Sequence, residues 1–174
     1  MPTVTAGPLP GSPAGRLGTP EGGGLAAARR LPVYSAEPRM NDFGALRVLI
    51  VDDHALYTEF LLRQLAPYEW IEVVGCAANG RDAVTLAAAA APDAILMDLD
   101  MPLLGGIEAI RRIHQRSDVP VLVLTASATA LDRERALAAG ALAVLPKTVD
   151  AVELSSRLAS ILVQRITLRS AARL

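Results

Sequence analysis

Short, uninterrupted runs of apolar residues, each followed by a stretch with helical periodicity, constrain the fold of this chain more than any other feature of its sequence. The runs follow one another from residue 46 onward, at 46–51, 71–75, 94–97, 119–124 and 141–145. Their apolar residues are largely continuous instead of alternating with polar ones, which is typical of strands covered on both faces. The pattern therefore predicts parallel strands beneath crossover helices.

The segments between these runs carry apolar residues at helical spacing. The expected helices contain Leu56, Phe60, Leu61 and Leu65; the alanine-rich stretch 83–91, which starts near Asn79; Ile107, Ile110 and Ile113; the stretch 130–139, which ends at Gly140; and the apolar residues of 152–162. A strand followed by a helix, repeated five times, predicts an α/β fold with an open, doubly wound sheet of five parallel strands.

The two ends of the chain differ in composition from this repeated part. Residues 1–39 contain seven Gly and seven Pro with little apolar periodicity, so we expect a disordered leader, and Met40 is an alternative start of the native protein. The folded domain is expected at 40–166. A short basic tail is expected at 167–174.

Charge and cysteine content exclude several classes of protein. The 18 acidic and 17 basic side chains leave a net charge of -1, so DNA binding by this chain is not expected. A single cysteine, Cys76, indicates a reducing compartment, and it is expected to be a small buried residue. No run of 18 apolar residues and no signal peptide is present, which favours a cytoplasmic protein without a membrane partner.

Charged and hydroxyl side chains gather where the expected strands end. Asp52 and Asp53 follow the first run, Asp98 follows the third, Thr125 ends the fourth, and Lys147 lies just beyond the fifth. Lys147 is also the one lysine of a chain that has 16 arginines. Since the carboxyl ends of parallel strands meet at one edge of a sheet, these side chains are predicted to form one site.

Three carboxylates in a small space favour a bound cation. They would raise one another's pKa unless a cation lies among them, and Mg²⁺ suits a site with few protein oxygen ligands. One carboxylate could then attack phosphorus while a lysine and a hydroxyl hold the phosphoryl oxygens. Taken singly, each residue is more often a helix cap, a turn residue or a surface charge, and only their coincidence favours a site.

His54 and His114 are not expected to form a second site.

Four segments resemble the receiver domain of bacterial two-component response regulators. They are VLIVDDH at 48–54, ILMDLDMP at 95–102, LVLTA at 122–126 and GALAVLPK at 140–147. The resemblance covers about residues 46–163 and is strongest to receivers of the LuxR/NarL type. It implies a CheY-like, flavodoxin-like fold with strand order 2-1-3-4-5.

The resemblance also implies roles for the residues of the acidic edge. Asp98 would accept a phosphoryl group from the phosphohistidine of a sensor histidine kinase. Asp53, Asp98 and the backbone carbonyl of Asp100 would bind Mg²⁺ directly. Asp52 would act mainly through a metal-bound water.

Thr125 and Lys147 would contact the phosphoryl oxygens, and here the sequence departs from the family. Three residues before Lys147, where the family usually has a switch aromatic, this chain has Val144, and no aromatic residue follows Trp70. Thr148 follows Lys147, where many receivers have proline. Because Val144 has no aromatic ring, the ring rotation that usually accompanies activation is not expected here. Movement of Thr125 toward the phosphoryl group is still expected.

The expected output is a contact with a protein partner or a second copy, through the fourth helix, fifth strand and fifth helix. Only 27 residues follow Lys147, which is too few for a helix-turn-helix domain, so a stand-alone receiver is expected. Such a receiver accepts phosphate without being an enzyme in the ordinary sense. Alternatives are a phosphorylation-independent receiver, a truncated LuxR-type transcription regulator and, since Asp100 follows Asp98 at the right spacing, a haloacid-dehalogenase-like phosphatase.

Overall fold

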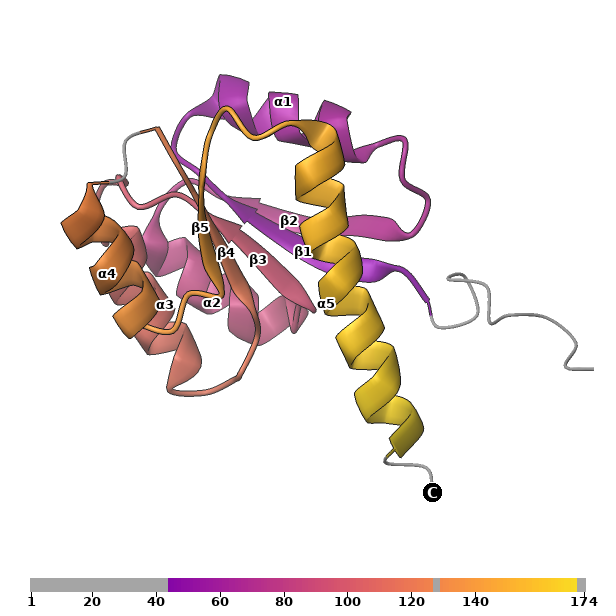
Figure 1. Cartoon of the computed structure of the whole chain (residues 1–174). Helices are drawn as coiled ribbons and strands as arrows, with labels where there is room; N and C mark the ends of the chain where they lie inside the picture. Colours follow the sequence, from indigo (N-terminus) through magenta and orange to yellow (C-terminus); the bar gives the residue numbers. More distant parts are fainter. Residues whose placement is uncertain (1–43, 127–128, 172–174) are drawn as a thin grey trace, which may run out of the picture. The chain divides into compact units, whose positions relative to one another are not determined.

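Five strands alternate with five helices in the computed structural model, which describes residues 44–126 and 129–171 (Figure 1). The strands are β1 (Leu46–Val51), β2 (Ile71–Ala77), β3 (Ala94–Met97), β4 (Val121–Thr125) and β5 (Ala143–Pro146). The helices are α1 (Ala55–Leu65), α2 (Gly80–Ala90), α3 (Gly106–His114), α4 (Ala130–Ala138) and α5 (Ala151–Ala171). The leader expected at 1–39 lies outside the described residues.

All strand pairs are parallel, and the sheet order is β2-β1-β3-β4-β5. This confirms the predicted five-stranded α/β fold and its strand order. Strand β1 is an interior strand. β2 pairs with one side of it, and the chain then crosses back to add β3, β4 and β5 on the other side. The crossover leaves the carboxyl ends of β1 and β3 as neighbours, which is where doubly wound sheets place their sites.

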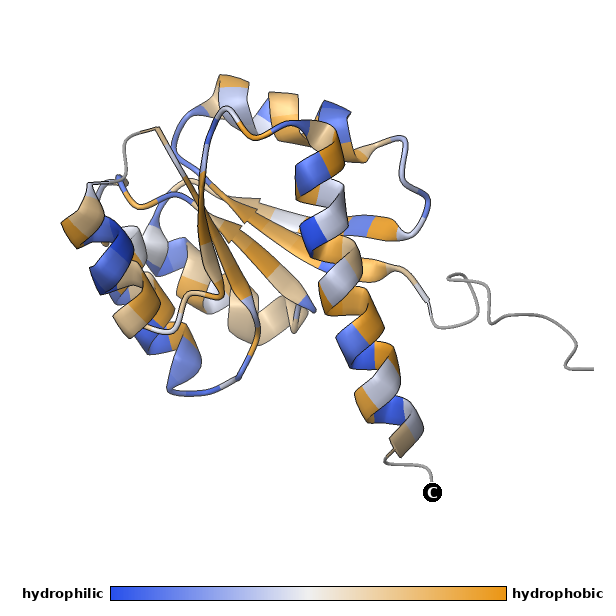
Figure 2. Ribbon diagram, in the orientation of Figure 1, coloured by the Kyte–Doolittle hydropathy of each residue, from blue (hydrophilic) through white to orange (hydrophobic). Residues whose placement is uncertain are grey.

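Alternate residues of the central strands supply two separate cores, one on each face of the sheet. Helices α1 and α5 cover one face, and α2, α3 and α4 cover the other (Figure 1). The α1/α5 core takes Val48, Leu96 and Leu124 from the sheet. The opposite core takes Leu49 and Met97 from the same strands. Figure 2 shows the result, with apolar central strands between helices of mixed polarity.

The edge strand β2 is less buried than its apolar run suggests. Most of its residues are half-buried or exposed, because among the described strands it pairs with β1 alone. The expectation that Cys76 is buried is wrong: its place on this edge strand leaves it exposed. Strands β4 and β5 also begin two residues later than their apolar runs, since Val119 and Ala141 belong to the turns that enter them.

Local capping explains where several helices begin and end. The Asn79 side chain accepts a hydrogen bond from the N–H of Asp82 at the start of α2, and Thr129 does the same for Asp132 at the start of α4. Helix α5 continues to Ala171, beyond the boundary expected at residue 166. Among the described helices, none is both long and apolar enough to cross a bilayer.

Candidate functional site

Strand register places the carboxylates of β1 and β3 side by side. Val51 pairs with Met97, so Asp52 and Asp98 leave the sheet at the same level. The N–H of Asp98 donates a hydrogen bond to the carbonyl of Val51 at 2.8 Å, which extends the ladder by one step beyond the strands. Both side chains are buried, and 2% of the Asp52 side chain and 3% of the Asp98 side chain are exposed.

Lys147 lies between these two buried carboxylates. Its Nζ is 2.6 Å from Oδ2 of Asp52 and 2.7 Å from Oδ2 of Asp98. The other carboxylate oxygen of Asp98, Oδ1, accepts a hydrogen bond from the N–H of Leu99 at 2.7 Å. One ammonium group thus neutralises part of the charge of two carboxylates, and the pair keeps an excess of negative charge.

Burial and this charge imbalance together set the proton affinities of the site. Burial raises the pKa of the Asp98 carboxyl, and the charge of Asp52 adds to the effect, while the hydrogen bond from Lys147 opposes it without cancelling it. Burial alone would lower the pKa of Lys147, but its hydrogen bonds to Asp52 and Asp98 outweigh burial and raise that pKa. Lys147 is therefore a firmly protonated cation at neutral pH.

Thr125 reaches the same edge from β4. Thr125 pairs with Pro146 of β5, and its carbonyl accepts a hydrogen bond from the N–H of Lys147 at 2.8 Å. Thr125 is buried. The Val144 side chain is also buried, and it packs into the core beneath α2, α3 and α4.

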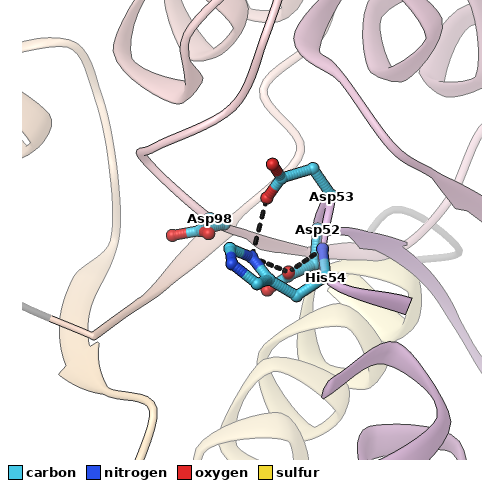
Figure 3. Close-up of side chains that lie close together, drawn as sticks. All are labelled: Asp52, Asp53, His54 and Asp98. Atoms are coloured by element: carbon cyan, nitrogen blue, oxygen red, sulfur yellow. Dashed lines mark hydrogen bonds and ion pairs between the residues drawn. The ribbon is translucent and has the colours of Figure 1, made fainter. Parts of the chain in front are cut away.

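Asp53 and His54 complete the acidic edge (Figure 3). The Nδ1 atom of His54 lies 2.8 Å from Oδ1 of Asp53 and 3.4 Å from Oδ1 of Asp52. Ligand atoms of Asp52, Asp53, His54 and Asp98 all lie within 4.8 Å of one another. Three carboxylates at this separation form a donor set that suits a hard divalent cation such as Mg²⁺. A cavity of about 290 Å³ lies beside Asp52 and Asp53, along α1.

The sequence-based site residues thus lie at one edge of the sheet, where Asp52, Asp98 and Thr125 are buried and Asp53 and Asp100 are exposed. His54 joins the acidic cluster and is not a separate site. His114 serves the fold instead, since its Nε2 lies 2.9 Å from the carbonyl of Val119 in the turn before β4.

Tyr57 is the residue of this site that sequence reasoning missed. Its hydroxyl donates a hydrogen bond to the carbonyl of Lys147 at 3.1 Å, and Lys147 Nζ lies 4.7 Å from the centre of its ring. The one available signal was its position in the first turn of the helix that follows Asp52 and Asp53. That signal is weak, because an aromatic residue at such a position is ordinarily a core residue.

Comparison with known proteins gives a consistent family. Residues 48–159 match the family model described as the response regulator receiver domain. A protein-glutamate methylesterase/protein-glutamine glutaminase of Anaeromyxobacter dehalogenans is 43% identical over 102 residues, which are 59% of this chain and 30% of the relative. The chain thus spans about a third of the length of the curated relatives it matches.

Two solved structures illustrate the similarity in three dimensions. A LuxR-family two-component response regulator from Aurantimonas has a TM-score of 0.65 and 32% identity, covering 70% of this chain and 87% of that one. A chain of the CheX-CheY-BeF3-Mg²⁺ complex from Borrelia burgdorferi has a TM-score of 0.62 and 27% identity, covering 69% and 92%. Together with the matched family model, the fold and the acidic edge lead to one conclusion: the chain belongs to the receiver-domain family of two-component response regulators.

Proposed function

We propose that this receiver domain is switched by transfer of a phosphoryl group to Asp98 in the presence of Mg²⁺. The observation that carries the proposal is the position of Asp98, a buried carboxylate whose Oδ2 lies 2.7 Å from Nζ of Lys147. An ammonium group at this distance can neutralise charge on a phosphoryl group attached to the same carboxylate. The similarity to a chain from a complex with BeF3 and Mg²⁺ adds support.

The proposed donor is the phosphohistidine of a sensor histidine kinase. A carboxylate oxygen of Asp98 forms a bond to phosphorus while the bond between phosphorus and the histidine nitrogen breaks. The electron pair of the broken bond stays on the imidazole, which then takes up a proton from water. Hydrolysis of the resulting acyl phosphate returns Asp98 and inorganic phosphate, so the domain is an acceptor that is reset and has no separate substrate. Such a donor implies a cytoplasmic location.

The acidic cluster is the proposed place for Mg²⁺. Asp53 and Asp98 would bind the ion directly with the carbonyl of Asp100, and Asp52 would act through a water molecule. When bound, the ion supplies positive charge near the phosphoryl oxygens. Asp52 and Lys147 together hold Asp98 in place for the transfer, with Nζ of Lys147 2.6 Å from Oδ2 of Asp52.

Output is proposed to pass through the face formed by α4, β5 and α5, with Thr125 as the group that responds to the phosphoryl oxygens. Exposed apolar side chains on and beside these elements support a protein partner or a second copy of the chain as the target. They are Leu131 and Leu137 on α4, Leu142 before β5 and Val152 on α5. Since Val144 is buried in the core, the proposed switch works without the usual aromatic ring on β5.

Incubation with Mg²⁺ and acetyl phosphate tests the proposal without requiring the cognate kinase. We expect one acid-labile, base-labile and hydroxylamine-sensitive phosphoryl group per chain, detected by intact mass, and none in Asp98→Asn. Asp118→Asn is a matched control, because Asp118 is an exposed aspartate in the turn before β4. Equal incorporation in wild type and Asp98→Asn, or none in wild type, would overturn the proposal.

A further inference from the structure

Tyr57 contacts both the backbone and the ammonium group of Lys147. The Tyr57 hydroxyl donates to the backbone carbonyl of Lys147 at 3.1 Å, and the Tyr57 ring lies 4.7 Å from the Nζ atom. The first contact fixes the residue where the chain leaves β5. The second contact places the face of an aromatic ring next to the ammonium group, within the range of a cation–π interaction.

A lysine at a phosphoryl site needs such support. Its side chain has four rotatable bonds and loses considerable rotamer freedom when its ammonium is held in one place. The bonds from Nζ to Asp52 and Asp98 act at the tip alone. They must also rearrange whenever the charge on Asp98 changes, whereas the ring of Tyr57 does not titrate with the carboxylates.

Tyr57 is itself held firmly. It lies in the first turn of α1, where its N–H donates to the carbonyl of His54 at 2.9 Å. Its ring packs against the α1/α5 core and lies 5.8 Å from the ring of Phe60. Burial raises the pKa of Tyr57 to about 12, and the charges of Asp52 and Asp98 add to this, so the phenol keeps its proton and remains a donor.

From these contacts we propose that Tyr57 is the positioning residue for Lys147, which presets the ammonium group for the phosphoryl oxygens. The inference rests on the proposed phosphorylation of Asp98. It also places the aromatic contact of this site on α1, whereas Val144 on β5 faces the core under α2, α3 and α4.

Two substitutions separate the ring from the hydroxyl. Tyr57→Leu removes both contacts, and we expect the rate constant of Asp98 phosphorylation by acetyl phosphate at saturating Mg²⁺ to fall roughly tenfold, as one lost cation–π contact implies. Tyr57→Phe keeps the ring and should stay within about threefold of wild type. The affinity for beryllofluoride should be highest in wild type, slightly lower in Tyr57→Phe and lowest in Tyr57→Leu.

Tyr68→Leu is the matched control. Tyr68 is also a half-buried tyrosine, but its ring packs on Trp70 and its hydroxyl lies 3.5 Å from the carbonyl of Ala151, away from Lys147. It should lose thermal stability without losing phosphorylation rate. A rate for Tyr57→Leu equal to that of wild type, or an equal loss in Tyr68→Leu, would overturn the inference.

The single lysine of the chain allows a second measurement that does not depend on phosphorylation or on the folding of a variant. In wild-type protein labelled with ¹³C,¹⁵N-lysine, the ε-methylene protons of Lys147 should be shifted upfield by the ring of Tyr57. The shift should persist in Tyr57→Phe. An unshifted lysine signal in wild type would refute the contact, whereas a shifted signal with no phosphoryl uptake would refute the proposed function alone.

Discussion

Two aspartates flank the short strand β3, and their surroundings are opposite in kind. Asp93 precedes the strand and lies beside Arg165 of α5, with Arg165 Nη1 2.8 Å from Oδ2 of Asp93. The same Oδ2 also accepts a hydrogen bond from the N–H of Arg47 at 3.0 Å. Asp98 follows the strand and shares one lysine with a second buried carboxylate, Asp52.

The two clusters therefore suit different roles. The cluster at Asp93 stabilises the fold, whereas the cluster at Asp98 has the unbalanced charge that a reactive site requires. At the Asp93 end, one carboxylate meets one guanidinium, and the pair ties α5 to the sheet. At the Asp98 end, two buried carboxylates meet one ammonium, and burial together with the charge of Asp52 raises the pKa of Asp98. Burying two carboxylates with one cation costs stability.

The largest expected effect comes from removing the shared lysine. Lys147→Met should lower the free energy of unfolding in metal-free buffer by about 3 kcal/mol, since it leaves two buried carboxylates without their cation. Arg165→Met, at the other end of β3, should cost only about 1 kcal/mol, because the N–H of Arg47 still bonds to Asp93. Urea unfolding of both variants measures the contrast, and equal losses would show that the two clusters do not differ.

Mg²⁺ should stabilise the protein through the Asp98 end of β3 and not through the Asp93 end. At a concentration 100 times its dissociation constant, it should raise the free energy of unfolding of wild type by about 2.7 kcal/mol. Asp53→Asn should lose most of this gain, whereas Asp93→Asn should keep it. Thermal melts with and without Mg²⁺ provide the measurement, and an equal Mg²⁺ response in the two variants would argue against a cation site at the carboxyl edge.

Neutralising each aspartate should have opposite consequences for stability. Asp98→Asn should raise the free energy of unfolding of the metal-free protein by roughly 1 kcal/mol, because it removes a buried charge and relieves repulsion with Asp52. Asp93→Asn should lower it by roughly 1 kcal/mol, because it weakens the bond from Arg165. Chemical denaturation at pH 7 tests this, and the same sign for both variants would contradict the comparison.

The smallest effect expected is on the pH dependence of stability. The pKa of Asp98 is raised in the folded state, so the native protein holds its proton above pH 4, where the unfolded chain has released it. Native Asp98 therefore binds more protons in this window, and its contribution makes stability fall as pH rises. Subtracting the pH profile of Asp98→Asn from that of wild type isolates the contribution, and a difference that rises with pH would show the pKa to be lowered instead.

Much of the fold could be predicted because its signals are local. Continuous apolar runs predict buried parallel strands. Asn79 marks the start of α2 through its capping side chain, and Gly140 marks the end of α4 through its positive φ. Cys76 shows the limit of this reasoning. It directly follows an apolar run and lies in the strand that the run begins. Only the place of that strand at the edge of the sheet, which depends on strand order, leaves Cys76 exposed.

The candidate site was also predictable from the sequence only in part. Asp52, Asp98, Thr125 and Lys147 could be assigned to one edge because parallel strands align their carboxyl ends. The part played by Tyr57 could not, because α1 and the segment after β5 are 90 residues apart in the chain. No local pattern couples two positions at that separation.

The strand and helix pattern, the family and the set of charged groups at the carboxyl edge could all be inferred from residue type and spacing along the chain. How those charges are shared depends on tertiary packing. This packing placed one ammonium between two buried carboxylates, a tyrosine ring against that ammonium, and a balanced ion pair at the far end of β3. Burial and distance set the energies of such groups, and both arise only when segments distant in sequence pack together.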